Sequence, residues 1–169
     1  GLTVNDANSF AKIGSDLFVG TGNISGNGTG VFKSTNNGVS WTPVNSGLTN
    51  LNVQQLIVSG TTLYAAIGAS GPPDGGVFKS TDNGASWNPC NNGLTYAHAY
   101  NIAALGSTLY VSSVPGTVFS STDAGANWTA VTDPILVDCR VKAIITAGPN
   151  QLVASDLGNT AGVLISTNG

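Results

Sequence analysis

The fold is decided by the stretch GVFKSTDNGASW, Gly76–Trp87, because similar stretches recur along the chain. GVFKSTNNGVSW begins at Gly30, TVFSSTDAGANW at Thr117 and GVLISTNG at Gly162. The serine before threonine in each copy stands at position 34, 80, 121 or 166, so successive copies are 46, 41 and 45 residues apart. A period in the forties with several short strands per unit is typical of a β-propeller, in which each repeat forms one blade.

The rest of the repeat unit also recurs, with copies that start at Gly1, Val44, Cys90 and, more diverged, Val141. The second run of each unit is apolar on both alternating faces, which indicates a strand buried between two neighbours. Glycines follow the first run, where we expect tight turns with positive φ, at Gly60, Gly106 and Gly148. Turn residues divide each unit into four short runs, which in the second unit are Val53–Val58, Thr62–Ile67, Gly76–Thr81 and Ser86–Cys90.

The composition favours an extracellular β protein with almost no helix. Charged residues are only 8% of the chain, against roughly 25% in an average soluble domain. All eight acidic residues are Asp, and Met is absent. Strong helix formers are therefore scarce, whereas residues suited to strands and turns dominate. We expect a secreted or cell-surface location.

Charge and hydrophobicity argue against two classes of partner, nucleic acids and membranes. The net charge is −3 with five cations, too few for the basic stripe that a phosphate backbone requires, so we expect no nucleic acid partner. No apolar run approaches the ~18 residues of a membrane span, so we expect no membrane insertion.

The spacing of Cys90 and Cys139 fits no zinc motif and no motif predicts a cofactor. A disulfide and two buried thiols both stay open.

The repeated stretch contains the pattern Ser-x-Asp-x-Gly-x-x-Trp. Asp or Asn in such a turn accepts local backbone N–H groups, Gly takes the positive-φ position, and Trp packs into the blade. We therefore expect structural roles for these residues. Two intact copies and one Asn variant consist of Ser34, Asn36, Gly38 and Trp41, of Ser80, Asp82, Gly84 and Trp87, and of Ser121, Asp123, Gly125 and Trp128.

This pattern resembles the Asp-box, or BNR, repeat, and the resemblance covers nearly the whole chain. Families with this repeat include sialidases, xyloglucan-degrading glycosidases, sortilin-type receptors, photosystem II assembly factors and exported bacterial repeat proteins. The resemblance implies a propeller whose boxes lie on the face opposite the usual binding site.

The sequence can be compared with the catalytic residues that the enzymes among these families require. A sialidase site requires several arginines to hold a carboxylate, and the chain has only Arg140. A glycosidase of the xyloglucanase type requires two carboxylates at one cleft. Asp16 is expected on the box side. The aspartates expected at the other end of the blades are Asp6, Asp74, Asp133, Asp138 and Asp156. No nucleophile has a spacing that suggests a triad with His98.

A binding site is the alternative to a catalytic one. Alternation places Tyr96, His98 and Tyr100 on one side of an extended segment, where they form either packing between blades or an aromatic platform for a sugar or peptide. Asp138 and Arg140 precede the next blade and are expected beside this platform. A site there draws on the loops Leu94–Asn101 and Thr132–Val141, with Gly68–Gly75 nearby.

The sequence therefore predicts an all-β fold, with residues 1–169 as part of a single β-propeller of four-stranded antiparallel blades. About four blades are present, but the fourth run occurs only three times and Gly1-Leu2-Thr3 matches a linker rather than a strand. We expect an open arc whose edges are covered by further blades or by a neighbouring chain. The predicted function is a module that binds a glycan or protein, or serves as a scaffold, with glycoside hydrolysis as the alternative.

Overall fold

A computed structural model describes residues 1–23, 25–68, 75–95, 98–113, 116–132, 141–147, 150–155 and 162–166. Every regular element in these ranges is a β-strand, and the strands form four antiparallel sheets. None of the described residues forms a helix that could span a membrane.

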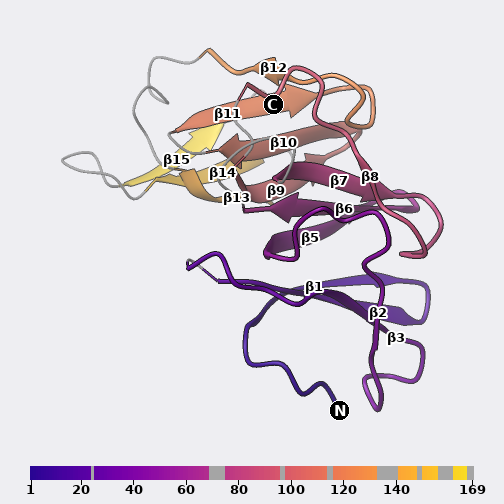
Figure 1. Cartoon of the computed structure of the whole chain (residues 1–169). Helices are drawn as coiled ribbons and strands as arrows, with labels where there is room; N and C mark the ends of the chain where they lie inside the picture. The colour runs from indigo at the N-terminus through magenta and orange to yellow at the C-terminus, as the bar shows by residue number, and fades with distance from the viewer. Residues whose placement is uncertain are drawn as a thin grey trace.

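The four sheets are blades one to four in chain order (Figure 1). Blades one to three have four strands each, in sequential order, and the described part of blade four has three. Blade one consists of β1 (Ala7–Ile13), β2 (Asp16–Thr21), β3 (Gly30–Ser34) and β4 (Thr42–Pro43). Blade two consists of β5 (Val53–Ser59), β6 (Thr62–Ile67), β7 (Gly76–Ser80) and β8 (Asn88–Pro89). Blade three consists of β9 (Ala99–Leu105), β10 (Thr108–Ser113), β11 (Thr117–Ser121) and β12 (Thr129–Ala130), and blade four of β13 (Val141–Ala147), β14 (Asn150–Ser155) and β15 (Gly162–Ser166).

The blades form an open arc, as the sequence predicts. The first strands pack in the order β1, β5, β9, β13, and the extensive contacts between sheets join consecutive blades. In Figure 1, blade one lies at one end of this stack, below blade two. Among the described residues, no strand packs extensively on the outer face of blade one.

Apolar side chains fill the two junctions on either side of blade two. Phe18, Leu63 and Trp87 belong to the core between blades one and two. Tyr64, Ile102 and Trp128 belong to the core between blades two and three. The whole of β6 after Thr62 is buried, because it supplies side chains to both cores. Burial on both faces explains its apolar sequence.

Two details of the blades differ from the sequence prediction or refine it. The fourth strand has only two residues in each blade that has one, although the sequence predicts a run of Ser86–Cys90. One further backbone bond, from Cys90 N to Val77 O at 2.9 Å, extends the pairing into the linker. The turns between first and second strands have positive φ at Gly60 and Gly106, as predicted; Gly148 lies outside the described residues.

Candidate functional site

Each hairpin that carries the pattern Ser-x-Asp-x-Gly-x-x-Trp, or its Asn variant, is called a box hairpin below. Each box hairpin is closed by hydrogen bonds between its own residues. In blade two, the Ser80 hydroxyl donates to Asp82 Oδ1 (2.7 Å) and accepts the Gly84 N–H (2.9 Å). Asp82 also accepts the Ser86 backbone N–H (2.9 Å) and the Ser86 hydroxyl. In blade three, Ser121, Asp123, Gly125 and Asn127 repeat this pattern. In blade one, Asn36 takes the place of the aspartate and accepts the Ser40 N–H at 2.9 Å.

These bonds fix the ionisation of the box carboxylates. The Ser86 side chain and backbone, followed by Ser80, lower the pKa of Asp82 to about 2. The Asn127 side chain and backbone, followed by Ser121, lower the pKa of Asp123 to about 2. A carboxylate that ionises so readily is a poor proton donor near neutral pH. The box aspartates are therefore unsuited to general acid catalysis.

The box tryptophans join neighbouring blades. The Trp87 indole N–H donates to Val44 O (2.8 Å) and that of Trp128 to Cys90 O (2.7 Å). Both side chains are buried, as the sequence predicts, with exposures of 2% and 4%. Trp41 is half-buried, and its indole N–H donates to Gly38 O of its own hairpin (3.1 Å). The tryptophan of each of blades two and three thus binds the segment that follows the preceding blade.

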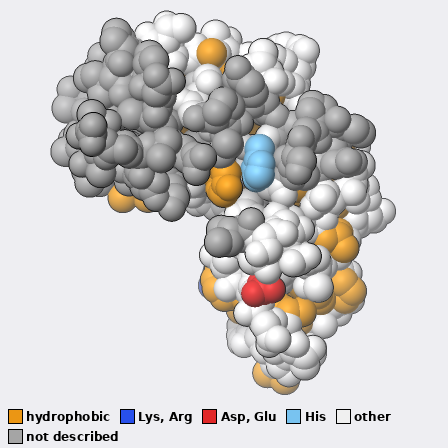
Figure 2. All heavy atoms as spheres, turned by 60° about the vertical axis from the view of Figure 1, so that its left-hand side comes forward, with side chains coloured by type: hydrophobic (Ala, Val, Ile, Leu, Met, Phe, Trp, Pro, Cys, Tyr) orange, Lys and Arg blue, Asp and Glu red, His pale blue; other side chains and the backbone are white. Residues whose placement is uncertain are grey.

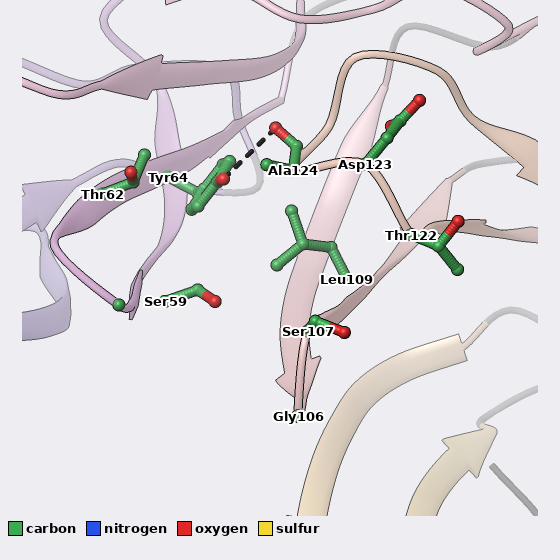
Figure 3. Close-up of a pocket in the computed structure, with 10 residues that line it drawn as sticks. Ser59, Thr62, Tyr64, Gly106, Ser107, Leu109, Thr122, Asp123 and Ala124 are labelled. Atoms are coloured by element: carbon green, nitrogen blue, oxygen red, sulfur yellow. Dashed lines mark hydrogen bonds between the residues drawn. The ribbon is translucent and has the colours of Figure 1, made fainter.

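A groove of about 550 Å³ lies between blades two and three on the box side (Figure 3). At the equivalent junction between blades one and two, Asn83 Nδ2 donates to Asp16 Oδ2 (2.7 Å), and Lys33 pairs with the same oxygen (2.8 Å). Ala124 and Thr62 replace Asn83 and Asp16 in the repeat and leave space. Ser59, Thr62, Tyr64, Ser107, Thr122 and Asp123 supply the polar lining, and the Tyr64 hydroxyl donates to Ala124 O (3.2 Å). The carboxylate among these lining residues, Asp123, has a pKa of about 2 and is therefore a weak base.

The opposite end of the blades holds the described part of the predicted site. Gly106 follows β9 and lines the groove together with box residues, whereas His98 precedes β9. His98 therefore lies at the end away from the boxes, and Figure 2 shows it at the surface beside a hydrophobic side chain. The rings of His98 and Tyr100 are stacked, with centroids 4.8 Å apart and an angle of 7° between their planes. Burial lowers the pKa of His98, which favours the neutral imidazole.

An amide network extends this end across blades one and two. The side-chain oxygen of Asn52 accepts the Asn23 backbone N–H (3.0 Å) and the Gln54 amide (3.0 Å). The Asn23 amide donates to the exposed Asp6 carboxylate (3.2 Å). The sequence alone does not predict a binding role for Asn23, Asn52 or Gln54. The period offers a signal, because Asp6, Asn52 and His98 are 46 residues apart and each precedes the first strand of its blade.

The structure brings His98 and Tyr100 together, while Tyr96, Asp138 and Arg140 lie outside the described residues. Of the aspartates considered for catalysis at this end, only Asp6 is described. Cys90 is a free, buried thiol, and burial raises its pKa to about 12; Cys139 is outside the described ranges. Within those ranges, His, Cys, Asp and Glu side chains form no group of three that could hold a metal ion.

Comparisons with known proteins place the fold. The model of the DUF6242 beta propeller domain matches residues 76–169, and no curated protein matches the chain. The extracellular domain of a protein of B. thetaiotaomicron described as a one component system is similar over 95% of this chain and 22% of its own length, with 13% identity and a TM-score of 0.67. The GH74 xyloglucanase of Xanthomonas campestris is similar over 95% of this chain and 29% of its own length, with 18% identity and a TM-score of 0.67.

A third structure, YCF48 bound to D1 peptide, is similar over 96% of this chain and 52% of its own length, with 12% identity and a TM-score of 0.62. The chain thus spans between about a fifth and about half of these three structures. At these identities the likeness concerns the fold alone.

Proposed function

Because the chain belongs to the DUF6242 β-propeller domain family, we propose that it is a binding module of a secreted or cell-surface protein, with residues 1–169 as part of one propeller domain. Its ligand is a glycan or a protein. The binding surface is the end of the blades away from the boxes, and the boxes have the structural role that the Asp-box resemblance implies.

The stacked pair His98–Tyr100 is the observation that carries this proposal. Two stacked rings with centroids 4.8 Å apart form an aromatic patch, and neither side chain is fully covered. Sugars and peptides both use aromatic faces of this kind, with nearby polar groups that fix their orientation. Asn23 and Gln54 at the same end are partly exposed and supply such groups, and the buried Asn52 holds both in place. In the proposal, Tyr96, Asp138 and Arg140 complete the site.

Two structures with a similar fold support a protein ligand and an exported location. One similar structure is described as bound to a peptide and another as an extracellular domain. The low charge content of this chain agrees with an extracellular location. The alternative role, a scaffold without a soluble ligand, uses the same fold and differs only in the outcome of binding experiments.

Binding of the whole chain to a glycan array and to a displayed peptide library tests this proposal. We expect at least one class of ligand, with binding reduced about tenfold or more by His98→Ala or Tyr100→Ala, since a desolvated aromatic contact is worth roughly 1–3 kcal/mol. Ser107→Ala in the groove on the box side is the matched control and leaves binding unchanged. The proposed site is wrong if the ligands bind equally well after both aromatic substitutions. If neither library contains a ligand, the result favours the scaffold role.

Glycoside hydrolysis is the second candidate, favoured by the exposed carboxylate of Asp6 at this end and by the fold likeness to a xyloglucanase. Release of reducing sugar from xyloglucan, abolished by Asp6→Asn, supports it. If the chain binds xyloglucan but releases no reducing sugar, the result supports only the binding function.

A further inference from the structure

Lys79 differs from its equivalent one junction earlier, because no carboxylate among the described residues pairs with it. Lys33 and Lys79 occupy the same position of β3 and β7, which share the sequence GVFKS. Lys33 pairs with Asp16 (2.8 Å), and its ammonium group also donates to Asn83 O of the next blade (3.4 Å). Lys79 makes the corresponding bond to Ala124 O (3.2 Å). The two ammonium groups are therefore held at the same place beside the neighbouring box hairpin.

The position of the missing carboxylate belongs to the groove between blades two and three. Thr62 is the first residue of β6, as Asp16 is of β2, and Thr62 lines the groove. The Tyr64 hydroxyl donates to Ala124 O (3.2 Å), the same oxygen to which Lys79 donates. The ammonium group of Lys79 thus lies at the edge of the groove, next to the space that an aspartate carboxylate fills in the other junction.

Hydroxyl groups line both walls of this groove. Those of Ser59 and Thr62 come from blade two and that of Thr122 from blade three, and all three residues are exposed or partly exposed. Tyr64 and Leu109 are buried and form the floor. A hydroxyl group both donates and accepts hydrogen bonds. Such walls suit a ligand that carries several hydroxyl groups of its own.

The carboxylate among the lining residues, Asp123, is bonded within its own hairpin. It accepts the Asn127 backbone N–H (2.9 Å), the Asn127 side-chain amide (2.8 Å) and the Ser121 hydroxyl (2.8 Å). In Figure 3 its side chain points away from Tyr64. The negative charge of Asp123 is therefore directed at the hairpin, which leaves Lys79 to bind an anion in the groove.

We propose that this groove binds a uronic acid residue of an acidic polysaccharide. The sugar carboxylate takes the place that the Asp16 carboxylate has in the other junction and accepts a hydrogen bond from Lys79, while the sugar hydroxyls bind the hydroxyl groups of the walls. The volume of about 550 Å³ lies within the range of sites for small ligands, roughly 300–1,000 Å³. This volume favours a whole sugar over the carboxylate of a peptide side chain. The site is separate from the surface around His98, which lies at the other end of the blades.

Calorimetric titration of the whole chain with trigalacturonate tests the proposal. We expect binding, and an affinity lower by about fivefold or more for the trimethyl ester, which keeps the hydroxyl groups without the charges. Lys79→Gln should cause a loss of the same size, because it removes the ammonium group. Lys33→Gln is the matched control and leaves binding unchanged, since Lys33 is already paired with Asp16. Equal affinities of the two variants overturn the proposal.

A double variant that closes the groove tests the site without changing the lysine. Thr62→Asp with Ala124→Asn introduces the two side chain types that fill the other junction, at Asp16 and Asn83. We expect this variant to fold, as circular dichroism checks, and to lose the binding of trigalacturonate. His98→Ala should bind trigalacturonate as the unaltered chain does, which distinguishes this site from that of the proposed function.

Four results would overturn the proposal. They are binding that survives the closure of the groove, binding that His98→Ala removes, no binding of trigalacturonate by the unaltered chain, and binding of triglutamate instead of trigalacturonate. The last of these would assign the groove to an acidic peptide.

Discussion

Gly47 lies directly against the backbone oxygen of Trp87, so closely that a methyl group on Gly47 would overlap this oxygen. Gly93 and Trp128 have the same relationship one blade later. The close approach lets the linker of one blade bind the tryptophan of the next through backbone bonds. The glycine is required here both by this contact and by its positive φ of 92° at Gly47.

Replacing Gly47 with Ala should strongly destabilise the chain. The positive φ costs an ordinary residue about 1–2 kcal/mol, and the overlap with Trp87 adds to this, so we expect a total loss above about 2 kcal/mol. Gly60→Ala is the matched control, because Gly60 also has positive φ but has open space around it. Urea denaturation of both variants gives the comparison, and equal losses would show that the contact with Trp87 contributes nothing.

The box carboxylates predict a loss of stability in acid. The folded-state pKa of Asp82 and of Asp123, about 2, lies below the ordinary value of 3.8. The stabilisation is therefore complete above pH 3.8 and is lost as the pH falls towards 2. Thermal unfolding followed by circular dichroism should show this decline. The double variant Asp82→Asn, Asp123→Asn should decline less, since blade one already uses Asn36 at this position.

Ala124 has a positive φ of 56°, a conformation that is unfavourable for alanine. Asn37 and Asn83 hold the same position in the other boxes, with φ of 55° and 60°. We expect Ala124→Asn or Ala124→Gly to stabilise the chain by about 0.5–1 kcal/mol, because asparagine and glycine tolerate this region better. Ala126→Gly in the same hairpin is the control and should not stabilise. A lower denaturation midpoint for both Ala124 variants would contradict the explanation.

Phe10 and Leu56 give a matched test of the outer face of blade one. Leu56→Ala removes a buried side chain and should cost about 2–5 kcal/mol. Phe10→Ala, at the equivalent exposed position, should cost less than about 0.5 kcal/mol in the chain of 169 residues. Calorimetric unfolding measures both. A large loss for Phe10→Ala would mean that Phe10 is already covered in solution.

His98 predicts a second, milder dependence on pH. Burial lowers its folded-state pKa from the ordinary value of 6.5. The unfolded chain then takes up the proton more readily, so stability falls as the pH drops below about 6.5. His98→Gln should remove this decline while leaving the acid transition of the box aspartates. A variant with an unchanged slope between pH 7 and pH 5 would locate the titrating group elsewhere.

Repetition explains why the sequence predicts the fold more fully than it predicts a binding site. A pattern that recurs, such as Ser80-x-Asp82-x-Gly84-x-x-Trp87, reports the local physics of one hairpin several times over. The second residue with positive φ, at Asn37, Asn83 and Ala124, escaped prediction because alanine gives no sign of that conformation. The groove forms because Ala124 and Thr62 are smaller than the residues at the equivalent positions of the neighbouring junction. There, Asn83 and Asp16 fill the space. A binding surface likewise depends on the residues that differ between repeats, such as His98 and Tyr100, and each of these occurs only once.

The bond from Trp87 to Val44 joins residues that are 43 positions apart, and that from Trp128 to Cys90 joins residues 38 apart. Each blade is thus completed only after its successor has been made. On a ribosome, which releases the N-terminal residues first, the linker after blade one must wait for the hairpin of blade two to emerge before its oxygens find their donors. Assembly during translation would therefore advance one blade at a time, always with a single unfinished sheet nearest the exit tunnel. This order limits how much unpaired strand edge is exposed at any moment.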